Sequence, residues 1–313
     1  MGSLVGHVIP GLGFLVIGLW HLFNLIKLHA LNPKSFTSSP WFPTSRMRYL
    51  ELFLIMGGSC TSIAMELFIG PESHQPLDSD GTIPTTHLHN FEHASISLSF
   101  FIYAAFAFLF DQIQPKAHHG ITQLLGALAF AQELLLFHLH STDHMGVEGQ
   151  YHLLLQIIIL VSMLTTLMGI SLQKSFLVSF VRSLGISFQG IWLMVMGFAL
   201  WTPSLIAKGC FMNSEDGHFV VRCETDHALY RAKALVNLQF SWFTAAVVVF
   251  GVSVYLALTV TYTKKVWYWS LGKMEEEYDD DDDDESRQKS RPDESKSLIH
   301  MGKGSTPGMD IER

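Results

Sequence analysis

Residues 151–173 read YHLLLQIIILVSMLTTLMGISLQ, an apolar run without a single Asp, Glu, Lys or Arg. A helix needs about 20 mostly apolar residues to cross the hydrocarbon core of a bilayer. The run is long enough to do so, and its Leu, Ile and Met side chains are suited to contact with lipid. This segment therefore predicts a transmembrane helix.

Six further stretches have the same apolar character, at about 5–28, 47–70, 88–110, 119–140, 183–202 and 232–262. The first has no charged segment before it and no small-residue cleavage site after it, so we interpret it as a retained helix and not as a signal peptide. The sequence thus predicts an all-α fold, a polytopic membrane bundle of seven transmembrane helices within residues 1–270.

The composition argues against several other classes. Hydrophobic residues make up 49% of the chain and charged residues only 15%, whereas an ordinary soluble domain has about 25% charged residues. Three cysteines are too few for a secreted disulfide scaffold. The pI of about 6.0 and the lack of a basic stripe argue against a nucleic-acid partner. The partner that the sequence indicates is the lipid bilayer.

The positions of Lys and Arg predict the orientation of the bundle, because cytosolic loops are enriched in these residues. Loops 71–87 and 141–150 contain neither, whereas the loops on the other side contain several, with Arg182 assigned to the fifth loop. We therefore predict an N-terminus outside or in the lumen and a C-terminus in the cytosol. Residues 271–313, which include an unbroken acidic run, are predicted to form a disordered cytosolic tail.

Several single residues have structural interpretations. Cys210 and Cys223 share the long outer loop 203–231, where they form either a disulfide or two free thiols. We expect Glu51 to pair with the nearby Arg48 and Trp41 to lie in the interfacial aromatic belt. Small or polar residues on the helices are expected to permit close helix approach or to form interhelical hydrogen bonds: Gly11, Gly13, Gly57 and Gly58 for the former, and Gln189, Trp192, Asn237 and Gln239 for the latter.

Histidines are the most informative residues. The chain has 16, and the predicted topology assigns 11 of them to the outer face. His93 lies at the outer start of the third helix, His140 at the outer end of the fourth, and His152 at the start of the fifth. Glu66 lies near the outer end of the second helix. Glu133 precedes His140 by seven residues, so both point the same way on one helix.

Imidazole and carboxylate ligands of this kind suit zinc, with copper, iron and nickel as the alternatives. We predict a metal site near the outer leaflet, formed by His93, His140 and His152 with Glu66 or Glu133. In a catalytic site one of these two carboxylates would act as general base toward metal-bound water. The sequence contains no H-E-x-x-H motif. The alternative interpretation is that the histidines face interfacial water or hydrogen-bond to each other.

Five short motifs occur in an order that resembles the transmembrane protein 45 family, also called domain of unknown function 716. They are Gly6-His7 followed by Pro10-Gly11, Asn90 to Ser95, Glu133 to His140, Tyr151 to Leu155, and Gln189-Gly190-x-Trp192. The resemblance is closest to plant members, some of which are described as related to virus responses. It implies a seven-helix protein of the endomembrane system or plasma membrane, and His7, Glu66, His93, Glu133, His140 and His152 as shared positions.

Two classes of function fit these observations. The first is a zinc-dependent membrane hydrolase that acts on a lipid or another amphiphile. The second is a non-enzymatic membrane protein: a transporter, a receptor or a scaffold with a structural metal. A transporter requires polar side chains through to the cytosolic side, and the sequence below Glu66 and Glu133 is expected to be mostly apolar. This expectation favours a one-sided site.

Overall fold

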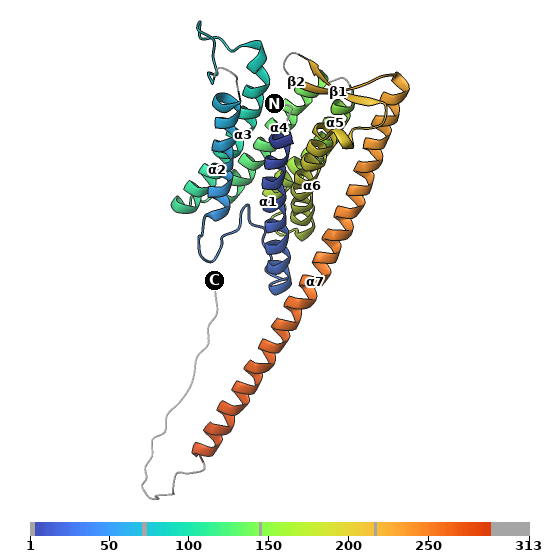
Figure 1. Cartoon of the computed structure of the whole chain (residues 1–313). Coiled ribbons are helices and arrows are strands. Elements are labelled where there is room, and N and C mark those ends of the chain that lie inside the picture. The colour runs from blue at the N-terminus through green and yellow to red at the C-terminus, as the bar shows by residue number, and fades with distance from the viewer. Residues whose placement is uncertain (1–3, 71–73, 144–145, 216–217, 289–313) are drawn as a thin grey trace, which may run out of the picture. The chain divides into compact units, whose positions relative to one another are not determined.

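The described part of the chain forms seven long helices, short helical turns and one hairpin (Figure 1). The computed structural model describes residues 4–70, 74–143, 146–215 and 218–288, with the side chains of 140–143, 218 and 265–288 outside the description. The elements are α1 (Leu4–Leu31), α2 (Leu50–Ala64) continued by the π turn η1 (Met65–Ile69), the 3-10 turn η2 (Thr85–His87), α3 (Leu88–Ile113), α4 (His118–Asp143), α5 (Val147–Ser171), α6 (Phe176–Trp201), the 3-10 turn η3 (Pro203–Leu205), β1 (Cys210–Glu215), β2 (His218–Cys223) and α7 (Asp226–Gln288).

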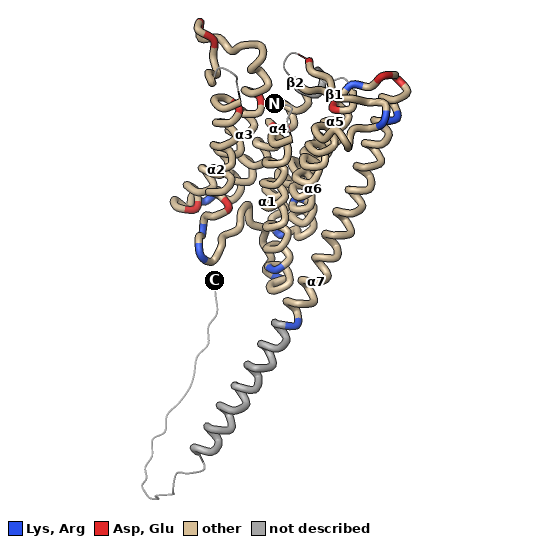
Figure 2. The backbone as a smooth tube through the Cα atoms, viewed as in Figure 1, with Lys and Arg blue, Asp and Glu red and all other residues tan. Residues whose placement is uncertain are grey.

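Seven helical segments in the described part of the chain are long and apolar enough to cross a membrane. The predicted all-α polytopic bundle is therefore confirmed, while its orientation stays a prediction. Figure 2 shows that Lys, Arg, Asp and Glu gather mainly toward the helix ends and in the connections between helices. The chain divides into two compact units, Met1–Thr263 and Lys264–Arg313, and the first of them forms the bundle. The predicted boundary at residue 270 and the disorder of 271–313 stay predictions.

Glycines allow α1 and α6 to pack closely. A Cβ atom added at Gly190 would lie 2.4 Å from the carbonyl oxygen of Gly11, and one added at Gly18 would lie 2.4 Å from Ser187 Oγ. The expected close approach at Gly11 is thus confirmed. The same expectation is wrong for Gly57 and Gly58, where an added Cβ would meet nothing within 4 Å among the described residues.

Polar bonds and aromatic rings connect α5, α6 and α7. The Trp192 indole donates to the backbone oxygen of Tyr151 at 3.1 Å, and the Tyr151 hydroxyl donates to Gln239 Oε1 at 2.7 Å. Gln150 donates to Asn237 Oδ1 at 2.7 Å. These residues make the interhelical bonds that the sequence predicted, and Trp192 is fully buried at their centre.

A two-stranded antiparallel hairpin, β1–β2, connects η3 to α7. Its first and last residues, Cys210 and Cys223, are paired in register and joined by a disulfide, so the first of the two interpretations is correct. Arg222 donates to Glu215 across the hairpin at 2.8 Å. Hydrogen bonds from Arg222 and from Asn213 lower the pKa of Glu215 to about 2.

The sixth helix starts seven residues earlier than the sequence predicted. Ser175 caps it by accepting from the Val178 N–H at 3.4 Å, and the helix then runs from Phe176 to Trp201. Arg182 therefore lies within the span and is 4% exposed, and its assignment to a cytosolic loop is wrong. The prediction failed because the partners of Arg182 come from distant parts of the chain.

The contact between α1 and α6 can be tested with one methyl group. Gly190→Ala places a Cβ against the backbone of α1, and we expect it to lower the free energy of unfolding by about 1–3 kcal/mol, as overpacking does in other proteins. The thermal unfolding midpoint in detergent is the measurement. Gly58→Ala, which enters open space, is the matched control and should not lower the midpoint. Equal midpoints for the two variants would contradict this packing.

Candidate functional site

The π turn η1 fixes the carboxylate of Glu66. The Gly70 N–H donates to the Met65 carbonyl, five residues earlier, at 2.7 Å. This bond releases the Glu66 carbonyl, which accepts from the Asn90 side chain of α3 at 2.9 Å. The same Asn90 nitrogen lies 3.1 Å from Glu66 Oε2. Short π turns are rare and frequently occur at functional sites, and this one holds a buried acid against α3.

His93, one turn along α3 from Asn90, contacts the other carboxylate oxygen. Its Nδ1 lies 3.4 Å from Glu66 Oε1, and 23% of its side chain is exposed. Since an ionised carboxylate can only accept hydrogen bonds, this contact favours a proton on Nδ1 and leaves Nε2 as the basic nitrogen of the ring.

His152 is held in the same tautomer by its own helix. Its Nδ1 lies 3.0 Å from the backbone oxygen of Glu148, one turn earlier on α5. A carbonyl oxygen can only accept, so the proton is on Nδ1. The residue is 2% exposed. Its ring centroid is 6.2 Å from that of His7 on α1, which in turn stacks on Trp201 at the end of α6 with centroids 4.5 Å apart.

The ring of Phe137 on α4 contacts both histidines. Its centroid is 6.3 Å from that of His93 and 5.7 Å from that of His152. The first six helices thus contribute to one group of side chains, at the end of the bundle where α1 begins (Figure 1). We call this group the histidine cluster. Its members are His7, Glu66, Asn90, His93, Phe137, His152 and Trp201.

Two predicted site residues, Glu133 and His140, lie on α4 on either side of Phe137. The side chain of His140 is outside the described residues. Glu133 is 1% exposed and accepts from the Gln189 amide of α6 at 2.7 Å. The structure therefore brings Glu66 to His93 but brings Glu133 to Gln189. Among the described side chains no group of three or more His, Cys, Asp or Glu residues could hold a metal ion, and zinc stays a prediction.

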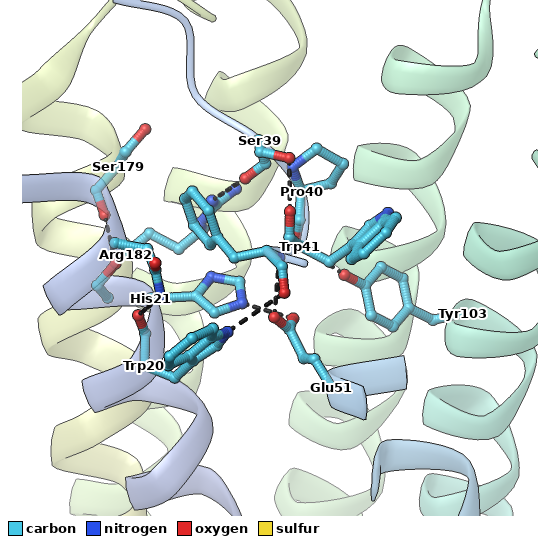
Figure 3. Close-up of polar contacts among 12 residues, drawn as sticks. Trp20, His21, Ser39, Pro40, Trp41, Glu51, Tyr103, Ser179 and Arg182 are labelled. Atoms are coloured by element: carbon cyan, nitrogen blue, oxygen red, sulfur yellow. Dashed lines mark hydrogen bonds and ion pairs between the residues drawn. The ribbon is translucent and has the colours of Figure 1, made fainter. Parts of the chain in front are cut away.

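A second polar group lies toward the opposite end of the bundle, around His21 of α1 and Glu51 of α2, and Figure 3 shows its contacts. His21 Nε2 of α1 lies 2.7 Å from Glu51 Oε1 of α2, and Glu51 Oε2 accepts from the backbone N–H of Phe42 at 2.9 Å. His21 and Glu51 are both buried. The predicted pairing of Glu51 with Arg48 is wrong, because Arg48 instead contacts Asp111 of α3 at 3.0 Å.

The connector between α1 and α2 is drawn into this end of the bundle. We call residues 36–42 the inserted segment, because Phe36, Trp41 and Phe42 are each at most 8% exposed. The interpretation of Trp41 as a belt residue is therefore wrong.

Side chains of four helices bond the backbone carbonyls of the inserted segment. His119 contacts Ser38 at 2.9 Å, Arg182 donates to Ser39 at 3.0 Å, Tyr103 to Pro40 at 3.0 Å and Trp20 to Phe42 at 3.4 Å.

Arg182 also binds a second buried partner. Its Nη1 donates to Gln123 Oε1 of α4 at 2.9 Å. Gln123 is 1% exposed and lies against Gly169 of α5, where an added Cβ would be 3.1 Å from its amide nitrogen. Polar side chains therefore continue to the opposite end of the bundle, and the expectation of a mostly apolar path below Glu133 is wrong.

Gln123, Arg182 and His21 belong to a buried group that was not predicted. The available signal was spacing on α6. Arg182 and Gln189 are seven residues apart and share a helix face, but the predicted start of this helix at residue 183 placed Arg182 outside it. Asn90 is part of one of the sequence motifs. Its hydrogen bond to the Glu66 carbonyl depends on the π turn, which no sequence pattern predicted.

A small cavity of about 90 Å³ lies between α5, α6, α7 and the hairpin, lined by Tyr151, Leu200, Val221, Val236 and other mainly apolar residues. Ordinary ligand pockets enclose roughly 300 Å³ or more. This cavity is therefore too small to take a lipid-sized substrate.

Residues 119–256 match the model of a family of unknown function, DUF716. The matched region begins in α4 and ends in α7, and it contains Glu133, His140 and His152. Glu66 and His93 precede it. The resemblance to this family is thus confirmed over these residues, which make up three of the helical spans and most of a fourth.

The buried pair at the inserted segment should contribute strongly to stability. Glu51→Ala leaves His21 and the Phe42 N–H without their acceptor, and losing one partner of a buried pair typically costs about 3–5 kcal/mol. We expect a much lower unfolding midpoint in detergent. Asp111→Ala removes the acceptor of the exposed Arg48 and of the Tyr49 hydroxyl, and it should lower the midpoint less. A Glu51→Ala midpoint as high as that of the control would contradict the role assigned to this pair.

Proposed function

We propose that this chain is an integral membrane protein that binds a divalent transition metal, zinc first, through His93, His140 and His152. One observation supports the proposal above the others. The Nδ1 atoms of His93 and His152 both face acceptors, the Glu66 carboxylate and the Glu148 carbonyl. Metal-binding histidines almost always donate their other N–H to a carboxylate or a backbone carbonyl, which orients the ring and raises its basicity.

The proposal gives Glu66 a defined role. Because Asn90 holds its carbonyl and one carboxylate oxygen, the other oxygen is aimed at His93. Glu66 is therefore proposed as a positioning residue that fixes a metal ligand. Glu133 is the remaining carboxylate that could take the proton of a metal-bound water. It lies one turn before Phe137 on α4, and the Gln189 amide donates to it.

Among reactions, we propose hydrolysis of a lipid or another amphiphile. A metal ion with an open coordination position lowers the pKa of bound water and supplies hydroxide at neutral pH. His93, His140 and His152 would hold such a metal, and Glu133 would take the proton of the activated water and pass it to the alkoxide that leaves when water cleaves the ester. The apolar side chains exposed on the outside of the helices favour a substrate that lies in the membrane. A scaffold with a structural metal is the alternative outcome.

We also propose that the chain is a plant-type member of the transmembrane protein 45 family. The support is the order of the five motifs along the sequence, of which Glu133 to His140, Tyr151 to Leu155 and Gln189-Gly190-x-Trp192 lie within the matched region 119–256. The resemblance further suggests the endomembrane system or the plasma membrane as the location.

Metal analysis of the purified protein tests the proposal. We expect about one equivalent of zinc per chain in the wild type, and its loss in His93→Ala, His140→Ala and His152→Ala. Glu66→Gln should weaken zinc affinity by about 10–100-fold, the usual effect of losing an outer-shell partner. His29→Ala, at the opposite end of α1, is the control and should keep the metal. A folded, metal-free wild type after zinc supplementation would overturn the proposal.

Hydrolysis of a fluorogenic long-chain ester in detergent then separates the two outcomes. In a hydrolase the zinc-loaded wild type cleaves the ester, while Glu133→Gln keeps zinc and loses cleavage. Stoichiometric zinc without cleavage of ester, amide or phosphodiester amphiphiles would overturn the hydrolase and leave the structural metal.

A further inference from the structure

Buried polar atoms without hydrogen-bond partners are concentrated in one part of the bundle. Within the described residues there are eight such side-chain atoms, and all belong to α1, α4, α5, α6 or the inserted segment. Buried polar groups are otherwise nearly always paired. The atoms are His21 Nδ1, Ser38 Oγ, His119 Nδ1, Gln123 Nε2, Glu133 Oε2, Ser162 Oγ, Arg182 Nε and Gln189 Oε1.

These atoms occupy successive levels along α6. At the first level the Gln189 amide donates a hydrogen bond to Glu133. About one turn further, Gly185 faces Ser162 of α5, whose hydroxyl would lie 3.0 Å from an added Cβ. At the next level Arg182 donates a hydrogen bond to Gln123. At a rise of about 1.5 Å per residue, the seven residues from Gln189 to Arg182 cover about 10 Å.

Titratable groups lie at both ends of this series. On the side of the histidine cluster, His152 is on α5 and His138 contacts Gln156, one turn further along that helix. At the opposite end the His21–Glu51 pair and His119 surround the inserted segment. We call the series from Glu133 to His21 the polar column: Glu133, Gln189, Ser162, Gln123, Arg182 and His21.

We infer that the polar column conducts protons between the two ends of the bundle. Buried atoms of this kind are the groups that internal water molecules bond, and ionisable residues inside a membrane segment mark ion and proton pathways. The proton enters the column at the buried carboxylate of Glu133, whose Oε2 has no hydrogen-bond partner among the described residues and whose Oε1 accepts from Gln189. The proton passes along water and the Ser162 hydroxyl to the His21–Glu51 pair, so each proton taken up at one end is released at the other.

A proton fits the column better than a metal cation does. The column includes a buried guanidinium, Arg182, which binds Gln123 and a backbone carbonyl. Its positive charge opposes any added cation in the same low-dielectric space, a metal ion and an excess proton alike, so the two differ in the space that each requires. A proton needs no cavity of its own, because hydroxyl and imidazole groups pass it on by exchanging hydrogen bonds.

Proton flux into liposomes tests this inference. The purified full-length chain is reconstituted with a pH-sensitive dye inside, and a potassium gradient with valinomycin drives protons inward. We expect the wild type to acidify the interior faster than protein-free liposomes do. Glu133→Gln should reduce the rate to the protein-free value, Glu133→Asp should restore part of it, and Ser162→Ala should slow it. Asp111→Asn, the same change of carboxylate to amide outside the column, should keep the wild-type rate.

Two results would overturn the inference: a wild-type rate equal to that of protein-free liposomes, or an unchanged rate in Glu133→Gln. Ser162→Ala removes a single oxygen, so it keeps the test valid if Glu133→Gln fails to fold. The flux does not depend on the proposed metal, and zinc removal with a chelator should leave it unchanged. Metal analysis and proton flux can therefore fail separately.

Discussion

A polar group inside a membrane must find its partners within the protein, because lipid offers none. This constraint accounts for most of the internal structure of the bundle. Arg182, Glu51 and Glu133 are each at most 4% exposed, and each binds a residue from another helix or from the inserted segment. Apolar packing alone would let the helices slide or rotate. The polar bonds fix which residues face each other and at what depth.

The constraint also explains why the two ends of the bundle differ. At the end where α1 begins, histidine rings contact each other and aromatic residues, and the tautomers of His93 and His152 are fixed by acceptors. At the opposite end, charged and aromatic donors satisfy the carbonyls of a buried stretch of chain. The first arrangement orients the imidazole rings of His93 and His152. The second satisfies backbone groups that a membrane would otherwise penalise.

Hydrophobic runs were sufficient to predict the seven helices and the bundle, because length and apolar character decide whether a segment can cross a bilayer. The convergence of Glu66 and His93 was also within reach, since both lie near the same ends of neighbouring helices. Arg182 was misplaced because hydropathy treats any arginine as a sign of water, whereas Gln123 and Ser39 satisfy this one. The inserted segment could not be predicted, since the side chains that hold it come from five different helices.

The inserted segment has a consequence for biogenesis. Its anchors are Trp20 on α1, Glu51 on α2, Tyr103 on α3, His119 on α4 and Arg182 on α6, and the Ser38 N–H also donates to the carbonyl of Gln173, just after α5. A ribosome delivers these helices to the membrane one after another. The connector made near the beginning of translation can therefore reach its final place only after the sixth helix has been inserted. Until then the carbonyls of the inserted segment must remain in water, so the burial of this segment is a late step in assembly.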